Sequence, residues 1–248
     1  GNALDTGILS NHNISVAGGT DKLRFRISGN YSYENGPMVT DKDKYTRKAL
    51  SAFVSADITK WYTQEITMYY TDTKKSALSS SIRDPFATRL ISWYPEGYMP
   101  GEILGTSEDY IIDSPRNSYL VSPTSTTRNS IPRIQMKSII KPLKNWDIVA
   151  EYTFNRNNYK YNNYTGIDTY TINSSETKYN ALNLYSTYKL ELGKHKASVM
   201  AGFNQESSWY GYLNTSIDEQ AVPTVPSFGG GTGTKNISEG YTEYAIRG

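Results

Sequence analysis

The strongest constraint on the fold is a strict alternation of residue character between Leu23 and Glu34. One set is apolar, glycine or aromatic: Leu23, Phe25, Ile27, Gly29, Tyr31 and Tyr33. The other set is polar or charged: Arg24, Arg26, Ser28, Asn30, Ser32 and Glu34. This pattern is typical of a β-strand with one apolar and one solvated face. A run of about a dozen residues is long for a soluble strand and suits a tilted strand that crosses a bilayer.

The same pattern recurs along the chain. Ile14 and Val16 alternate before a turn at Gly18-Gly19-Thr20-Asp21, which predicts that the first two strands form a hairpin. Further alternating runs predict strands in the ranges 45–59, 64–73, 134–140, 147–155, 182–191, 197–212 and 241–247. Between them, polar stretches without periodicity predict long connections at 74–131, at 156–178 and around the glycines at 229–231.

The order of the predicted connections indicates the architecture. From the first hairpin onward they run short, moderate, short, very long, short, long, short, long. A Greek-key sandwich gives no reason for this order, whereas an outer-membrane barrel has short periplasmic turns and long extracellular loops. Aromatic residues near both sets of connections match two interfacial girdles: Trp61, Trp146, Tyr31, Tyr33, Tyr152 and Tyr210. The sequence therefore predicts an all-β chain of about nine antiparallel, up-and-down transmembrane strands with long extracellular loops.

Composition excludes several other classes of protein. Only 37% of the residues are hydrophobic and no apolar run approaches the roughly 18 to 20 residues of a membrane-spanning helix. A barrel is compatible with this composition because only alternate strand residues face lipid. A net charge of +2 gives no sign of nucleic-acid binding, and the absence of cysteine excludes disulfides, zinc thiolates and thiol catalysis.

Three segments resemble a known family. Residues 12–36, HNISVAGGTDKLRFRISGNYSYENG, resemble a signature hairpin of the SusC/RagA-like TonB-dependent outer-membrane transporters. In that hairpin a His-Asn-x-Ser-x-x-Gly-Gly run precedes an alternating strand that ends in glycine. Residues 84–102, DPFATRLISWYPEGYMPGE, are similar to a family loop in which a helical turn leads to an aromatic-Pro-Gly stretch. Residues 193–206 resemble a later family hairpin, so the resemblance covers most of the chain in order.

The resemblance implies a 22-stranded barrel closed by an N-terminal plug. Residues 1–248 are then expected to form an internal part of one barrel domain, with the plug and the barrel ends outside this sequence. A section of nine strands inserted alone would leave unpaired backbone groups in lipid, at several kcal/mol each. We therefore expect this sequence to be the middle of a larger polypeptide or one piece of a split barrel.

The longest predicted connection is the candidate ligand site. Its aromatic and cationic residues lie among small polar ones, and such rings with hydrogen-bonding neighbours suit sugar rings or peptide backbones. The alternative is that they pack the loop against the barrel wall. The candidate ligand-binding residues are Arg89, Trp93, Tyr94, Tyr98, Tyr110, Arg116 and Tyr119.

A second set of residues is predicted to face the lumen of the barrel. Their side chains would contact the plug or tune the pore, and structural ion pairing is the simplest interpretation. They are Arg24, Arg26, Arg133, Lys137, Glu151 and Lys189.

Catalysis has little support in the sequence. The two histidines, His12 and His195, are predicted on a strand and in a tight turn, with no sign of a nucleophile held beside either of them. The acidic residues near Asp43 lack the spacing of a known calcium-binding loop. We therefore expect no enzymatic activity, no catalytic residues, no metal and no cofactor.

Three functions remain to be compared. The family resemblance implies import of oligosaccharides or peptides across the bacterial outer membrane, energised by TonB through the plug and assisted by a SusD-like surface lipoprotein. The alternative is a non-transporting surface binding protein or adhesin built on the same strands. An outer-membrane barrel enzyme would need a histidine beside a serine or an acid pair, and the sequence predicts none.

Overall fold

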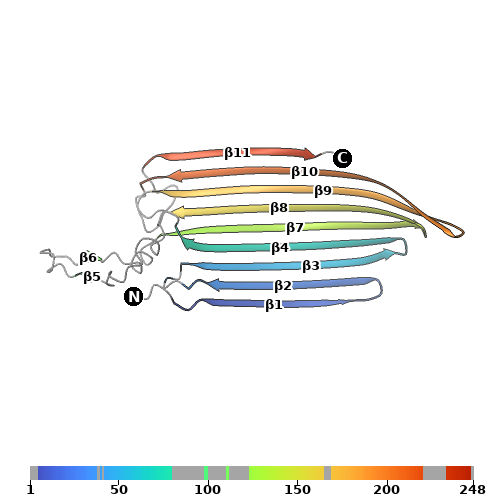
Figure 1. Cartoon of the computed structure of the whole chain (residues 1–248), viewed down its shortest axis with the longest axis horizontal. Coiled ribbons are helices and arrows are strands. Elements are labelled where there is room, and N and C mark those ends of the chain that lie inside the picture. Colours follow the sequence, from blue (N-terminus) through green and yellow to red (C-terminus); the bar gives the residue numbers. More distant parts are fainter. Residues whose placement is uncertain are drawn as a thin grey trace.

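A computed structural model describes residues 5–37, 40, 42–79, 98–99, 110–111, 123–164, 169–219 and 233–246. In these ranges the chain forms a nine-stranded antiparallel sheet whose strands lie side by side in the order in which they occur along the chain (Figure 1). Its strands are β1 (Ile8–Gly19), β2 (Leu23–Asn35), β3 (Lys44–Thr59), β4 (Tyr62–Leu78), β7 (Thr124–Leu143), β8 (Trp146–Tyr164), β9 (Tyr170–Leu192), β10 (His195–Ile217) and β11 (Lys235–Ile246). The predicted all-β, up-and-down fold is confirmed.

Two further strands are separate from the large sheet. β5 (Tyr98–Met99) and β6 (Tyr110–Ile111) pair only with each other. Within the described ranges, no helix has both the length and the apolar character needed to cross a membrane.

The two ends of the sheet carry different connections. Tight turns join β1 to β2, β3 to β4, β7 to β8 and β9 to β10 at one end, on the right in Figure 1. The strand ends that the longer connections join lie at the opposite end of the sheet, and these connections span 36–43, 79–123, 165–169 and 218–234. The predicted alternation of short and longer connections is confirmed in its order.

One predicted connection is wrong. The polar stretch 156–178 was expected to be a long loop, but β8 continues to Tyr164 and β9 begins at Tyr170. Here both faces of the strands are polar, as in the cross-strand pairs Asn157–Thr177 on one face and Asn158–Glu176 on the other. Because alternation requires two faces of different polarity, it disappears while the backbone pairing continues. The connection predicted at 74–131 shrinks to 79–123 in the same way, and the helical turn predicted at 84–91 lies outside the described residues.

The register places the apolar residues of neighbouring strands on one face of the sheet. Directly paired residues of antiparallel strands point to the same side, and Ala52, Met68, Ile134 and Phe154 form one such line across β3, β4, β7 and β8. The apolar band, as we call this surface, contains Ile14, Val16, Ile27, Leu50, Val54, Ile66, Met68, Ile134, Met136, Ile148, Tyr152, Leu184, Val199 and Phe203.

The apolar band is not covered by any other part of the described chain. Leu50 is 53% exposed, Leu184 40% and Val199 61%, whereas the buried hydrophobic residues among those described are only Val149, Ala181 and Ile217. Soluble proteins rarely leave so large a continuous apolar surface in water. The sheet therefore has the side-chain distribution of a wall with an apolar environment on one side.

The apolar band is inclined to the strands. The line through Met68, Ile134 and Phe154 continues to Asn180 on β9 and Ser207 on β10. On these two strands the apolar residues begin two and four positions closer to the tight turns, at Leu182 and Phe203. Such an offset is expected when strands tilt by about 35–45° relative to the barrel axis.

Close steric contacts explain why positions 18 and 19 of the signature hairpin are glycine. A side chain at Gly18 would meet the ring of Phe25, its cross-strand partner, at 3.1 Å. A side chain at Gly19 would collide with the backbone of Leu23 and Arg24, where the chain returns after the turn. The Gly-Gly pair therefore allows the first hairpin to close tightly over an aromatic ring.

Candidate functional site

The face opposite the apolar band carries the candidate site. On this face one continuous line of directly paired residues crosses seven strands from β2 to β10. We call it the polar row, and it consists of Arg24, Ser55, Glu65, Lys137, Glu151, Asn183 and Asn204.

Most neighbours in the polar row are joined by hydrogen bonds or ion pairs. Arg24 Nη2 donates to Ser55 Oγ at 3.3 Å, and Ser55 Oγ donates to Glu65 Oε1 at 3.4 Å. Lys137 Nζ lies 3.0 Å from Glu151 Oε1. At the β10 end, the Asn204 side-chain amide donates to Asn183.

The charges of the polar row balance. Two cations, Arg24 and Lys137, alternate with two carboxylates, Glu65 and Glu151. Glu151 has two partners for its carboxylate, because Tyr185 Oη donates to Oε1 at 3.3 Å in addition to the ion pair with Lys137. Its side chain is only 19% exposed. Lys137 and Glu151 form an ion pair, and Ser55 links Arg24 to Glu65, so each cation of the row has a carboxylate partner directly or through one hydroxyl group.

All six residues predicted to face the lumen lie on this polar face. Arg24, Lys137 and Glu151 are members of the polar row, while Arg26 and Arg133 lie two and four residues further toward the longer connections. The sixth residue, Lys189, is close to the tight turns, where its Nζ lies 3.5 Å from Asp147 Oδ2. The structure thus brings the predicted set together on one surface.

A shallow hollow of about 360 Å³ lies next to the polar row on β2, β3 and β4. It combines a guanidinium group, two aromatic rings and several hydroxyl groups, which suit the carbonyl and hydroxyl groups of peptides or sugars. Its polar-face lining residues are Arg26, Ser28, Ser51, Phe53, Thr67 and Tyr69. Sequence reasoning named only Arg26, because the others become neighbours only through the strand register.

The seven predicted ligand-binding residues fall in the longest connection. Arg89, Trp93, Tyr94, Arg116 and Tyr119 lie outside the described residues. The backbones of Tyr98 and Tyr110 are described, and the pairing of β5 with β6 places Tyr98 opposite Ile111 and Met99 opposite Tyr110. This pairing brings two parts of the predicted ligand loop side by side.

One pair of residues was not expected from the sequence. Ser10 Oγ and His12 Nε2 lie 2.8 Å apart on β1, and the His12 ring stacks on Tyr31 with 6.5 Å between ring centroids. A catalytic serine also needs an orienting acid and a pocket, and among the described residues no carboxylate forms a hydrogen bond or ion pair with His12. In the same part of the chain no three His, Asp or Glu side chains gather as a metal site.

The fold and the two faces define a class of structure, an open section of an up-and-down β-barrel wall. The solved structures that are similar to this chain include the RagAB peptide importer in its "closed-closed" and "open-open" states and the RagAB peptide transporter. Each matches with a TM-score of 0.72 over 98% of this chain, at 12%, 13% and 12% sequence identity. The SusC/RagA-like resemblance predicted from sequence is therefore confirmed at the level of the fold.

The match covers only a part of those larger chains. This chain spans 29% of the first two and 30% of the third. No protein-family model matches the sequence, and the search of curated proteins gives no match.

Proposed function

We propose that this chain is a section of the barrel wall of a bacterial outer-membrane importer. The observation that carries the proposal is the exposed apolar band on one face and the polar row on the other, in a chain that matches part of the RagAB peptide importer structures over 98% of its own length. In this proposal the apolar band contacts lipid and the polar row faces the lumen. The end with the longer connections faces the outside of the cell.

The rest of the machinery follows from the same proposal. A plug outside the described sheet would fill the lumen and connect to TonB, and a SusD-like surface lipoprotein would cover the outer end. The paired charges of the polar row would give the plug a defined surface without attracting counter-ions into the pore, since each cation already has a carboxylate nearby. The substrate would be a peptide or an oligosaccharide.

Within this proposal the longest connection makes the first contact with substrate. Its candidate residues remain Arg89, Trp93, Tyr94, Tyr98, Tyr110, Arg116 and Tyr119. The hollow around Arg26 and Tyr69 would offer a later polar contact on the barrel wall.

An uptake assay tests the proposal. Cells that carry the native polypeptide are expected to accumulate labelled oligopeptides or oligosaccharides in a saturable manner, and an uncoupler of the proton-motive force is expected to abolish accumulation. Trp93→Ala combined with Tyr94→Ala is expected to raise the half-saturating concentration severalfold, because stacking on an aromatic ring contributes about 0.5–1.5 kcal/mol. Folded protein in the outer membrane that binds these ligands without importing them would refute import and favour a surface binding protein.

A further inference from the structure

The face of the sheet that carries the apolar band becomes strongly cationic beyond it, toward the longer connections. On five consecutive strands of the sheet, β3, β4, β7, β8 and β9, basic residues lie just beyond the apolar band, and Leu78 on β4 and Ile172 on β9 lie further out on the same face. We call this group the cationic belt, and it consists of Lys48, Lys74, Arg128, Arg156, Lys160 and Lys178. On the same portion of these strands the only acids of this face are Asp72 and Glu176.

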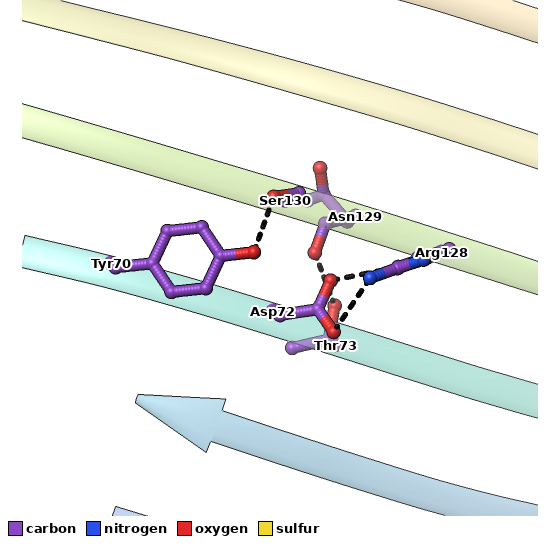
Figure 2. Close-up of polar contacts among 6 residues, drawn as sticks. All are labelled: Tyr70, Asp72, Thr73, Arg128, Asn129 and Ser130. Carbon is purple, nitrogen blue, oxygen red and sulfur yellow. Dashed lines mark hydrogen bonds and ion pairs between the residues drawn. The ribbon is translucent and has the colours of Figure 1, made fainter. Parts of the chain in front are cut away.

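The two acids each hold an arginine. Asp72 accepts two hydrogen bonds from Arg128, at 2.9 Å from Nε and 3.3 Å from Nη2 (Figure 2). Next to this pair, on the side toward the apolar band, Ser130 Oγ donates to Tyr70 Oη at 3.2 Å, so an aromatic side chain lies between the band and the charged group. On β8 and β9, Glu176 Oε1 lies 2.7 Å from Arg156 Nε and 3.3 Å from Lys178 Nζ.

The remaining lysines of the belt form no close ion pair among the described residues, although Lys48 lies directly across from Asp72, whose carboxylate accepts from Arg128. Lys48, Lys74 and Lys160 are exposed and make no ion pair among the described residues. Lys74 and Lys160 are the direct cross-strand partners of Arg128, one on each side. Like charges placed directly opposite each other destabilise a sheet, so this line of three cations would gain from an external anion.

The position of the belt indicates which anion it meets. Lys48 and Arg156 come two residues beyond the last apolar residues of their strands, Leu50 and Phe154, and Lys74 comes four beyond Tyr70. At about 3.3 Å per residue and a tilt near 40°, these side chains begin roughly 5–10 Å above the apolar band. Arg128 and Lys160 come six residues beyond Ile134 and Phe154, which is roughly 15 Å by the same measure. Lipid headgroups occupy about 5–8 Å on each side of the hydrocarbon core, and long lysine and arginine side chains can extend back into this region.

We propose that the cationic belt binds the phosphate groups of phosphorylated glycolipid in the outer leaflet of the membrane. This inference rests on the proposed function, which places the apolar band in lipid and the longer connections outside the cell. Lysine and arginine are the usual partners of phosphate in proteins. Lysine binds it through a compact ammonium charge, and arginine through a planar guanidinium group that can donate two hydrogen bonds. Asp72 and Glu176 hold the arginines in place, while Lys48, Lys74 and Lys160 form no ion pair within the described chain and give the belt its excess of positive charge.

The test uses the native polypeptide, extracted from membranes and titrated with diphosphorylated lipid A while bound lipid is counted by native mass spectrometry. The variant Lys48→Gln/Lys74→Gln/Lys160→Gln is expected to bind this lipid about tenfold more weakly or worse, because each basic residue near an anionic surface contributes about fivefold. A matched control, Lys22→Gln/Lys60→Gln/Lys144→Gln, removes the same charge from the tight turns and is expected to bind within twofold of the unmodified protein. Dephosphorylated lipid A with the same acyl chains should bind weakly to all three.

The outcomes separate this inference from the proposed function. Recovery of the unmodified protein as a folded species in the outer-membrane fraction tests the membrane location independently of lipid A. If the protein is recovered there but the triple variant binds lipid A as tightly as the unmodified protein, or phosphate removal changes nothing, the inference is overturned. If the triple variant fails to fold, two further variants decide. Lys48→Arg/Lys74→Arg/Lys160→Arg should retain lipid A binding, and Lys74→Gln alone should bind lipid A about threefold to fivefold more weakly. Binding by Lys74→Gln as tight as that of the unmodified protein would overturn the inference.

Discussion

Leu184→Arg is expected to lower the free energy of unfolding by about 2–4 kcal/mol, the cost of an arginine near the midplane on the lipid face of a barrel. Leu184 is 40% exposed on β9 and lies in the middle of the apolar band, between Ala150 and Phe203 on the neighbouring strands. A polar environment on that face would impose no such cost. The measurement is urea unfolding of the native polypeptide in lipid vesicles.

Thr187→Arg is the matched control for this prediction. Thr187 lies three residues further along β9, on the opposite face, where its cross-strand partners are Asp147 and Met200. An arginine there has a carboxylate beside it and access to water, so we expect a change of about 1 kcal/mol or less. Equal destabilisation by the two substitutions would contradict the assignment of the faces.

Gly19→Ala is expected to destabilise the first hairpin by about 2 kcal/mol or more. The added methyl group would collide with the backbone oxygen of Leu23, and backbone, unlike a flexible side chain, cannot move aside without opening the turn. The same vesicle unfolding assay measures the loss, and faster amide hydrogen exchange in β1 and β2 should accompany it.

Gly29→Ala provides the comparison within the same hairpin. Its methyl group would meet Ile14 Cγ2 at 3.6 Å, an ordinary contact, and alanine is favoured over glycine within a strand by about 0.5–1 kcal/mol. We therefore expect this variant to be as stable as the unmodified protein or slightly more stable. Similar losses for both glycine variants would refute the steric explanation of the Gly-Gly pair.

The parts of the fold that the sequence predicted are those with two faces of different polarity. Where Leu23 to Tyr33 alternate with Arg24 to Glu34, local pattern alone places every side chain on its face. The six residues predicted to face the lumen lie on one surface for the same reason, because each stands opposite an apolar run on its own strand.

The remaining features depend on information that is not local. The halves of β8 and β9 nearer the longer connections carry polar residues on both faces. These segments form strands because they pair with their neighbours, and the sequence shows no periodicity that would predict it. The ion pair of Asp72 with Arg128 joins residues 56 positions apart, across the longest connection, and requires the exact register of β4 with β7. The contact of Ser10 with His12 joins residues that are only two positions apart. Residues i and i+2 of a strand lie on the same face, so this spacing could have predicted the contact from the sequence.

The central claim, that one face of the sheet contacts lipid and the other contacts water, has a direct test. The chain contains no cysteine, so single cysteines can be placed at each position from Asn183 to Tyr188 on β9 and exposed to a membrane-impermeant maleimide in intact outer membranes. We predict reaction at 183, 185 and 187, on the polar face, and protection at 184, 186 and 188, although Leu184 and Tyr188 are open in the structure of the chain alone. Equal reaction at all six positions would contradict the claim.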